Sequence, residues 1–309
     1  MVMRLNRKQK SKGVKMKRKN LFLICWIIAL ILFSLACTRK PDNVALSADG
    51  VKISFDQQGK GKPVIIFIHG WANTKSVWDE QMTHFSEKYR VIAIDLPDFG
   101  ESGYNRTNWT MESFGVDVTA VIKKLNLKQV VLVGFSLGAY ISIETAKTAP
   151  ENLIGLVLVD EIKNVEMKYS AEMIAYIDSL LMDIVTNPTN EKLVGGGFYK
   201  KNHEESYERV LSMLSAHKNT SRIGWKESLD EALRWLNEDC IESLKKVQIP
   251  IISISSDMEP TNVEAFKKYV PSYKLKIIPD VAHLVMWDNP EEFNRLLEES
   301  IQEFISKSK

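Results

Sequence analysis

Cysteine is scarce in this chain of 309 residues, which contains three. Cys25 lies inside an uncharged apolar segment, Cys37 ends that segment, and Cys240 stands alone in the rest of the chain. Cysteines placed in this way supply no intrachain disulfide framework. We expect Cys240 to be a small buried side chain rather than a nucleophile.

Acidic residues are absent from the first 19 positions, which hold nine lysines and arginines. The rest of the chain therefore has 32 basic residues against 39 acidic ones, a net charge of −7. A mildly acidic body argues against nucleic acid as a partner. The overall composition, with 45% hydrophobic and 26% charged residues, is that of an ordinary globular protein.

Charge is also missing from residues 21–36, "LFLICWIIALILFSLA", which follow the basic run. Sixteen residues are short for a spanning helix, which needs about 20, and fit the apolar part of a secretory signal better. The residues "FSLA" before Cys37 resemble the lipobox of bacterial lipoproteins, in which the cysteine is acylated. An uncleaved anchor and a conventional signal are the alternatives. In all three cases we expect residues 38–309 to be exported and, with an anchor or a lipid, held at the membrane surface.

Short apolar runs recur along the body of the chain, with helical patterns between them. Runs apolar on both faces are typical of a parallel sheet that helices cover on each side. Residues 52–59, which are more polar, are expected to form an antiparallel edge strand. The apolar runs are residues 64–68, 91–94, 130–133, 156–159, 251–255 and 275–278. The expected helices are residues 76–87, 110–126, 137–149, 260–269 and 290–306. This alternation predicts a mostly parallel, doubly wound α/β fold.

One interval interrupts the alternation. Roughly ninety residues between Val159 and Pro250 contain no strand-like run and show helical periodicity instead. We predict a helical cap over residues 161–247, inserted into an α/β core formed by residues 38–160 and 248–309, after a signal or anchor of residues 1–37. A cap inserted at the carboxyl ends of strands is expected to border the binding crevice.

A serine between two glycines marks the end of the third apolar run, in "VVLVGFSLGAY". The pentapeptide Gly134-Phe135-Ser136-Leu137-Gly138 matches G-x-S-x-G, in which a strained turn presents a nucleophilic serine between a strand and a helix. The same serine in a glycine turn could instead cap the helix. The nucleophile interpretation requires further catalytic residues elsewhere in the chain, whereas the cap interpretation does not.

A serine nucleophile needs a base that a carboxylate orients. Of the five histidines, only His283 follows both the serine and a candidate acid. Two acids end apolar runs after Ser136, namely Asp160 and Asp257. We prefer Asp257, because it ends the run after the insertion, and keep Asp160 as the alternative and Glu259 as a remote third choice.

Acyl transfer also needs N–H donors for the oxyanion. The "HGW" that follows residues 64–68 offers the backbone N–H of Trp71, and the residue after the serine offers that of Leu137. A plain turn at His69-Gly70 is the alternative interpretation.

With these residues in place, the chain resembles the α/β-hydrolase family, and specifically its members with a cap. Five segments in order support the resemblance: "FIHGW" (67–71), "DLPDFGES" (95–102), "GFSLGA" (134–139), "SSDMEP" (255–260) and "DVAHLVMWDNPEEF" (280–293). The resemblance implies Ser136 as nucleophile, His283 as base, Asp257 as its acid, and Trp71 and Leu137 as oxyanion donors. Asp98-Phe99 stand where relatives often have Gly-His, which we interpret as a difference in a surface loop.

The expected activity is hydrolysis of a carboxylic ester or related small acyl compound, through an acyl-enzyme and without a metal or other cofactor. A carbon–carbon hydrolase, lactonase, thioesterase or acyltransferase would use the same residues. A membrane-tethered binding protein without catalysis is the rival outside enzymology, since a fold does not prove a function. The sequence does not indicate an oligomeric state.

Overall fold

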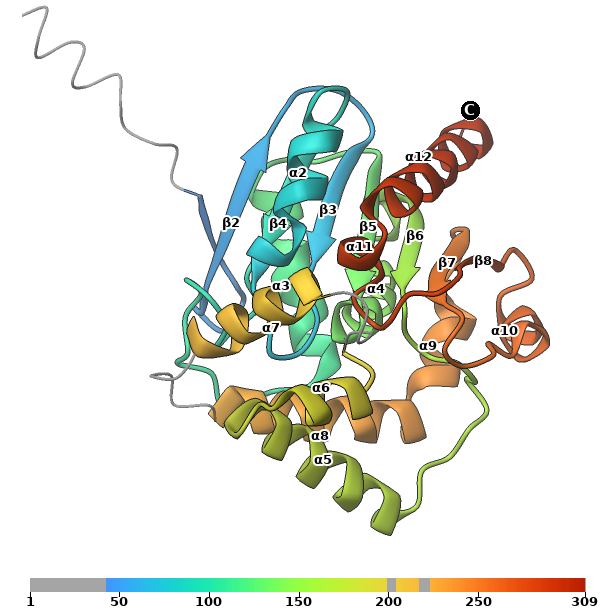
Figure 1. Ribbon diagram of the computed structural model, residues 1–309. Coiled ribbons are helices and arrows are strands. Elements are labelled where there is room, and N and C mark those ends of the chain that lie inside the picture. Colours follow the sequence, from blue (N-terminus) through green and yellow to red (C-terminus); the bar gives the residue numbers. More distant parts are fainter. Residues whose placement is uncertain (1–42, 199–203, 217–222, 309) are drawn as a thin grey trace, which may run out of the picture. The chain divides into compact units, whose positions relative to one another are not determined.

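The structure is a computed structural model that describes residues 43–198, 204–216 and 223–308 (Figure 1). The predicted signal segment 1–37, with its lipidation candidate Cys37, lies outside the described residues. No helix within the described ranges is both long and apolar enough to cross a membrane.

Eight strands form one sheet in the order β1-β2-β4-β3-β5-β6-β7-β8. Strands β3 to β8 run parallel to one another, whereas β2 is antiparallel to both of its neighbours. The strands are β1 (Val44–Leu46), β2 (Lys52–Gln58), β3 (Val64–Ile68), β4 (Arg90–Ile94), β5 (Val130–Phe135), β6 (Leu153–Val159), β7 (Ile251–Ser256) and β8 (Lys274–Ile278). The predicted mostly parallel α/β fold is confirmed. The antiparallel direction of β2 is confirmed too, but the short β1, which the sequence did not indicate, occupies the edge.

The register brings the carboxyl ends of the central strands together. Ile68 of β3 lies opposite Gly134 of β5, which in turn lies opposite Leu158 of β6. All residues of β3 and β5 are buried, because helices cover both faces of the sheet. Segments that follow these strands, including Ser136, therefore meet at one edge of the sheet.

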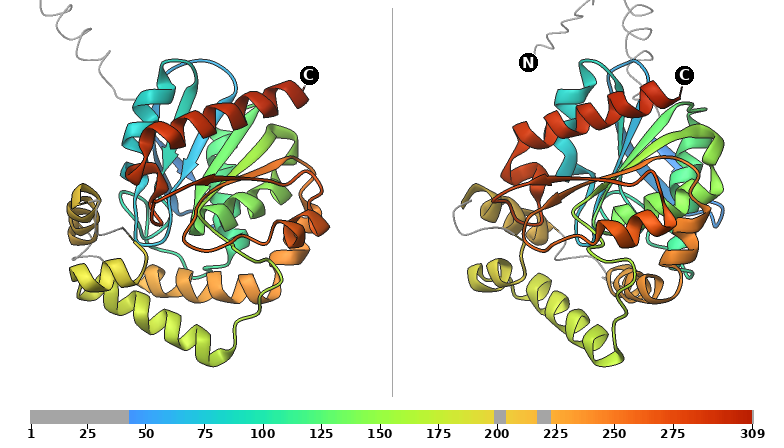
Figure 2. Two further views of the ribbon diagram at one scale, coloured as in Figure 1. Left: turned by 45° about the vertical axis from the view of Figure 1, so that its right-hand side comes forward. Right: turned by 90° about the vertical axis from the view of Figure 1, so that its right-hand side faces the viewer.

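The helices of the core form two layers, one on each face of the sheet (Figures 1 and 2). Helices α2 and α12 pack together on one face, with the short α11 beside them, and α3, α4, α9 and α10 cover the other. The core helices are α2 (Asp79–Ser86), α3 (Met111–Lys124), α4 (Leu137–Thr148), α9 (Cys240–Lys246), α10 (Val263–Tyr269), α11 (Val285–Asp288) and α12 (Pro290–Lys307), with 3-10 turns η1 (Lys75–Trp78) and η2 (Pro150–Asn152).

Within the described residues, the long interval between β6 and β7 contains helices and loops but no strand, and we refer to its part before α9 as the cap. Its helices before α9 are α5 (Ala171–Thr186), α6 (Asn190–Gly195), α7 (Glu204–Ala216) and α8 (Ile223–Glu238). Helices α5, α6 and α8 lie beyond the carboxyl ends of the parallel strands, at the bottom of Figure 1, and the turned views agree. The side chains of Ser170 and Thr189 cap α5 and α6 by accepting backbone N–H groups.

Asp98 and Phe99 form the contact between the β4–α3 connection and α8. The Asp98 carboxylate accepts the backbone N–H of Gly224 at 2.7 Å, and the Phe99 ring stacks on Trp225 with centroids 5.5 Å apart. Both residues are buried. Our interpretation of this pair as a surface-loop difference was wrong, because α8 covers the loop.

Candidate active site

Ser136 occupies the turn between β5 and α4. Its φ of 51° and ψ of −117° are unusual for a residue with a side chain, and such strain persists only where the surroundings enforce it. The Ser136 N–H donates to the carbonyl of Val159 at 3.0 Å, and its own carbonyl accepts the N–H of Ala139 at 2.8 Å. The side chain makes no capping hydrogen bond to α4. The capping interpretation is therefore not what the structure shows.

Two glycines allow this turn to pack closely. A Cβ on Gly134 would lie 2.2 Å from the carbonyl oxygen of Gly138, which is far inside van der Waals contact. A Cβ on Gly70, in the loop after β3, would lie 2.9 Å from the Phe135 ring and 3.1 Å from the Ser136 Cβ. The absence of these carbons brings strand, helix and the "HGW" loop together around the serine.

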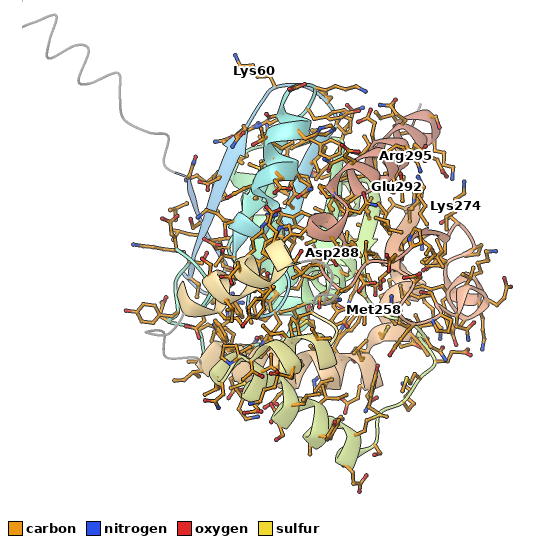
Figure 3. All side chains as sticks on the ribbon, in the orientation of Figure 1. Lys60, Met258, Lys274, Asp288, Glu292 and Arg295 are labelled. Carbon is orange, nitrogen blue, oxygen red and sulfur yellow. The ribbon has the colours of Figure 1, made fainter. Side chains whose placement is uncertain are left out.

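His283 lies in the loop between β8 and α11. Its backbone N–H donates to the carbonyl of Gly197 at 3.0 Å, and its half-buried ring packs on Phe135 with centroids 4.7 Å apart. The Asp288 carboxylate, labelled in Figure 3, accepts the N–H of Ala282 at 2.7 Å and so fixes the preceding residue. His283 is thus held through its backbone by the segment after α6 and through its ring by the core residue Phe135.

The acid beside His283 is Asp160. Its Oδ2 is 2.7 Å from the His283 Nδ1. Because a carboxylate only accepts hydrogen bonds, Nδ1 carries the proton in this arrangement and Nε2 is left as the basic nitrogen. Asp160 has a φ of 40° and is 4% exposed, so the connection after β6 turns sharply to bring the carboxylate inward.

The preferred prediction, Asp257, is corrected by this geometry. Asp257 is exposed, and its Oδ1 accepts the backbone N–H of Asp280 at 3.1 Å. The residue at the end of β7 that contacts Asp160 is Ser256, which precedes Asp257 in the chain. Ser256 donates both its backbone N–H and its hydroxyl to the Asp160 Oδ1, each at 2.8 Å. The third choice, Glu259, is exposed at the rim of the pocket.

The Asp160 carboxylate is stabilised as an anion. Burial by itself would raise its pKa, but the hydrogen bond and charge of His283 and the ammonium of Lys163 hold the pKa well below its ordinary value. The Lys163 Nζ lies 2.8 Å from the Asp160 Oδ1. The anion is therefore available to orient an imidazole and to stabilise its protonated form.

The pKa of Glu161, the next residue, is shifted in the opposite direction. Its side chain is buried, its Oε2 is without a hydrogen-bond partner within the described structure, and its Oε1 is 3.4 Å from the Ser253 hydroxyl. Burial raises the pKa of Glu161 to about 8, with Asp160 adding to the effect and Lys163 opposing it. Glu161 is therefore neutral near pH 7 beside an ionised neighbour.

The predicted oxyanion donors border the serine. Trp71 follows β3 and its indole N–H donates to the carbonyl of Trp225 at 2.7 Å, which anchors the loop to α8. Leu137 is the first residue of α4, where backbone N–H groups have no partner inside the helix. Both residues line the pocket that contains Ser136.

His69 is structural. It is fully buried, its Nε2 accepts the backbone N–H of Leu96 at 3.0 Å, and its Nδ1 therefore donates to the carbonyl of Gly70 at 2.7 Å. These bonds join the loops that follow β3 and β4 and hold the "HGW" backbone in place.

A cavity of about 490 Å³ lies between the carboxyl edge of the sheet and the cap. Ser136, Asp160 and His283 line it from the core, and Met258, labelled in Figure 3, lines it from the segment after β7. Most of its other wall is apolar and comes from the cap, including Ile177, Leu181, Phe198, Met213, Leu229 and Leu233. Such a cavity suits a substrate with an apolar group.

Two expectations about other chemistry concern cysteine and metals. Cys240 is buried, as predicted, and burial raises the pKa of its thiol to about 12, which makes it a poor nucleophile. Within the residues that the structure describes, no group of three or more His, Cys, Asp or Glu side chains is arranged to hold a metal ion.

Three residues of this site were not identified from the sequence. Ser256 and Lys163 contact Asp160 directly, and Glu161 is buried beside it. The sequence feature that could have indicated them is "DEIK" directly after an apolar run, in which Lys163 follows Asp160 by three residues.

Comparison with known proteins agrees with this geometry. Residues 63–290, well over half of the chain, match the sequence profile of the family described as alpha/beta hydrolase fold. An uncharacterized hydrolase of Bacillus subtilis is 32% identical over 115 residues, which cover 37% of this chain and 42% of that protein. A bifunctional esterase/perhydrolase of Acinetobacter calcoaceticus is 25% identical over 265 residues, covering 80% of this chain and 95% of that protein.

A solved esterase structure from Exiguobacterium antarcticum has a TM-score of 0.72 at 21% identity, over 84% of this chain and 99% of that chain. At that level of identity the likeness concerns the fold. With the profile match over residues 63–290, the sheet order and the turn at Ser136, the chain belongs to the alpha/beta hydrolase family.

Proposed function

We propose that this protein hydrolyses carboxylic esters through an acyl-enzyme formed on Ser136, with His283 as the base and Asp160 as the residue that orients it. The observation that carries the proposal is the 2.7 Å hydrogen bond between His283 and a buried aspartate, in the pocket that also contains Ser136. Full-length relatives named esterase/perhydrolase and non-heme haloperoxidase support the same class of chemistry.

In the first half of the reaction, the Ser136 Oγ attacks the carbonyl carbon of the ester while the His283 Nε2 takes the hydroxyl proton. Asp160 stabilises the imidazolium that forms. The negative charge on the carbonyl oxygen is placed within reach of the backbone N–H groups of Trp71 and Leu137. Collapse of this intermediate breaks the bond to the alcohol, which leaves with the proton from His283.

In the second half, water attacks the acyl-enzyme and gives its proton to His283. The carbonyl re-forms, the bond to Ser136 breaks, and the serine recovers its proton as the carboxylic acid leaves. Every step uses side chains or backbone groups that line the pocket.

The test is an ester series on the full chain in detergent. Initial rates would be measured with nitrophenyl esters of increasing acyl length for the wild type and for Ser136→Ala, with the exposed Ser76→Ala as a matched control. We expect Ser136→Ala to lose at least about 10³-fold in kcat and Ser76→Ala to match the wild type. Equal rates for wild type and Ser136→Ala would contradict the proposal.

Thioesters, lactones and diketones belong in the same experiment, because the triad supports all of these reactions. Inactivity of the wild type across all of them would favour the tethered binding protein. A preference for lactones would identify a lactonase. One similar solved structure is that of an enzyme that degrades N-acyl homoserine lactones.

We also propose that residues 1–37 direct export and that Cys37 is acylated, so that the hydrolase is held at the outer side of a membrane. The support is the sequence of a basic run, an apolar segment and a cysteine after "FSLA".

A further inference from the structure

The Asp160 carboxylate binds an imidazole through one oxygen and an ammonium group through the other. His283 binds its Oδ2, and Lys163 binds its Oδ1 with a separation of 2.8 Å. The side chain of Asp160 is 5% exposed and that of Lys163 is 21% exposed, so water screens this ion pair only in part. The ammonium of Lys163 thus forms an ion pair with the carboxylate that we assign as the acid of the triad.

The backbone of Lys163 is fixed as well. Its carbonyl accepts the N–H of Asn262, just before α10, with a separation of 2.6 Å. Asn262 also caps α10 through its side chain, which accepts the N–H of Ala265. Lys163 therefore connects a core helix to the active-site carboxylate and also lines the pocket.

We propose that Lys163 is a positioning residue that holds Asp160 in its inward orientation and lowers the pH at which His283 can act as a base. The proposal rests on the proposed function of Ser136, His283 and Asp160. A protonated imidazole gains stability from a carboxylate, and a second cation on that carboxylate reduces the gain. Lys163 therefore keeps His283 in its basic form at a more acidic pH than Asp160 alone would allow.

Other charged or titratable groups surround this pair on several elements. They come from the same connection, from α4, from the segment after β7 and from the β8–α11 loop, and they are Glu161, Tyr140, Glu259 and His283. Burial raises the pKa of Glu161 to about 8, so its titration affects the neutral to alkaline range. The acidic limb of the pH–rate profile, below about pH 7, is where the effect of Lys163 is best separated from that of Glu161.

The experiment compares kcat/KM from acidic to neutral pH for the wild type, Lys163→Met, Lys163→Gln and Lys163→Arg, all as full chains. Methionine and glutamine remove the charge, and glutamine keeps a hydrogen-bond donor in case the methionine variant does not fold. We expect the acidic limb to move to higher pH by about 0.5 to 1 unit in both neutral variants. Lys163→Arg, which keeps the charge, should retain the position of the wild-type limb.

A purely structural role would lower kcat equally at every pH and leave the limb where it is. That result, or a limb that moves to lower pH, would overturn the proposal. A readout without turnover separates this outcome from failure of the proposed function. The titration midpoint of the His283 ring proton, assigned by NMR with His283→Gln, should be higher in Lys163→Met than in the wild type, whether or not any ester is hydrolysed.

An unchanged NMR midpoint would overturn the role of Lys163. Failure of the wild type to hydrolyse any ester in the series, with a shifted midpoint, would instead reject the ester-hydrolase proposal and leave the effect of Lys163 on His283 standing.

Discussion

The imidazole of His283 is hydrogen-bonded to the carboxylate of Asp160, with 2.7 Å between Nδ1 and Oδ2. The two residues are 123 positions apart in the chain and meet at the carboxyl edge of the sheet. Asp160 follows β6, and Ser256, at the end of the neighbouring β7, donates two hydrogen bonds to the same carboxylate. The acid is thus placed by one strand and fixed by the next.

The raised pKa of Glu161 predicts that the free energy of unfolding depends on pH. An acid whose pKa is raised by folding holds its proton more tightly in the folded chain. Its contribution to stability is complete below the unfolded pKa of about 4.3 and is lost as the pH rises towards the folded value of about 8. Relative to Glu161→Gln, the wild type should lose roughly 3 to 5 kcal/mol of unfolding free energy between pH 4 and pH 8.

Urea unfolding followed by tryptophan fluorescence would measure this difference. The exposed Glu264→Gln, at the start of α10, is the control and should follow the wild type at each pH. A constant difference between the wild type and Glu161→Gln across this range would show that Glu161 is not held neutral by burial.

Gly134 predicts a steric effect on the serine turn. In Gly134→Ala the new Cβ would meet the backbone of Gly138 at 2.2 Å, so strand β5 and helix α4 must separate. We expect a loss of about 2 to 4 kcal/mol in stability together with most of the ester hydrolysis. Gly195→Ala, in α6, is the matched control, because nothing lies within 4 Å of its Cβ position. Thermal melting that does not distinguish the two variants would contradict the packing described for this turn.

Cys37 predicts a covalent lipid. In a bacterial host with lipoprotein processing, the wild type should incorporate a palmitate analogue and Cys37→Ala should not. Cys240→Ala should be labelled like the wild type, because Cys240 is buried in the core. Absence of label in the wild type would reject acylation and favour an uncleaved anchor or a conventional signal.

The sequence alone predicted seven of the eight strands, all but β1, and two of the residues that line the pocket, Ser136 and His283. The apolar runs at 64–68 and 130–133 are unambiguous because both faces of these strands are buried. Ser136 and His283 could be predicted because a glycine-flanked serine and a late histidine each occur in a specific local pattern.

The acid could not be predicted in the same way. Asp160 and Asp257 each follow a buried strand, and β6 and β7 are neighbours, so position in the chain does not separate them. The choice depends on the direction of each side chain, which the φ of 40° at Asp160 and the inward position of Ser256 determine. Burial of Phe99 escaped prediction for a similar reason, since α8 contacts it from more than 120 residues later in the chain.

The assignment of Asp160 is the centre of this account, and a pair of isosteric variants tests it most directly. The measurement is kcat/KM for ester hydrolysis by Asp160→Asn and Asp257→Asn, with circular dichroism to confirm that both are folded. We predict that Asp160→Asn loses about 10³- to 10⁴-fold, because an amide no longer favours the tautomer with a proton on Nδ1, whereas Asp257→Asn stays within a few-fold of the wild type. A large loss in Asp257→Asn with near wild-type activity in Asp160→Asn would contradict the account.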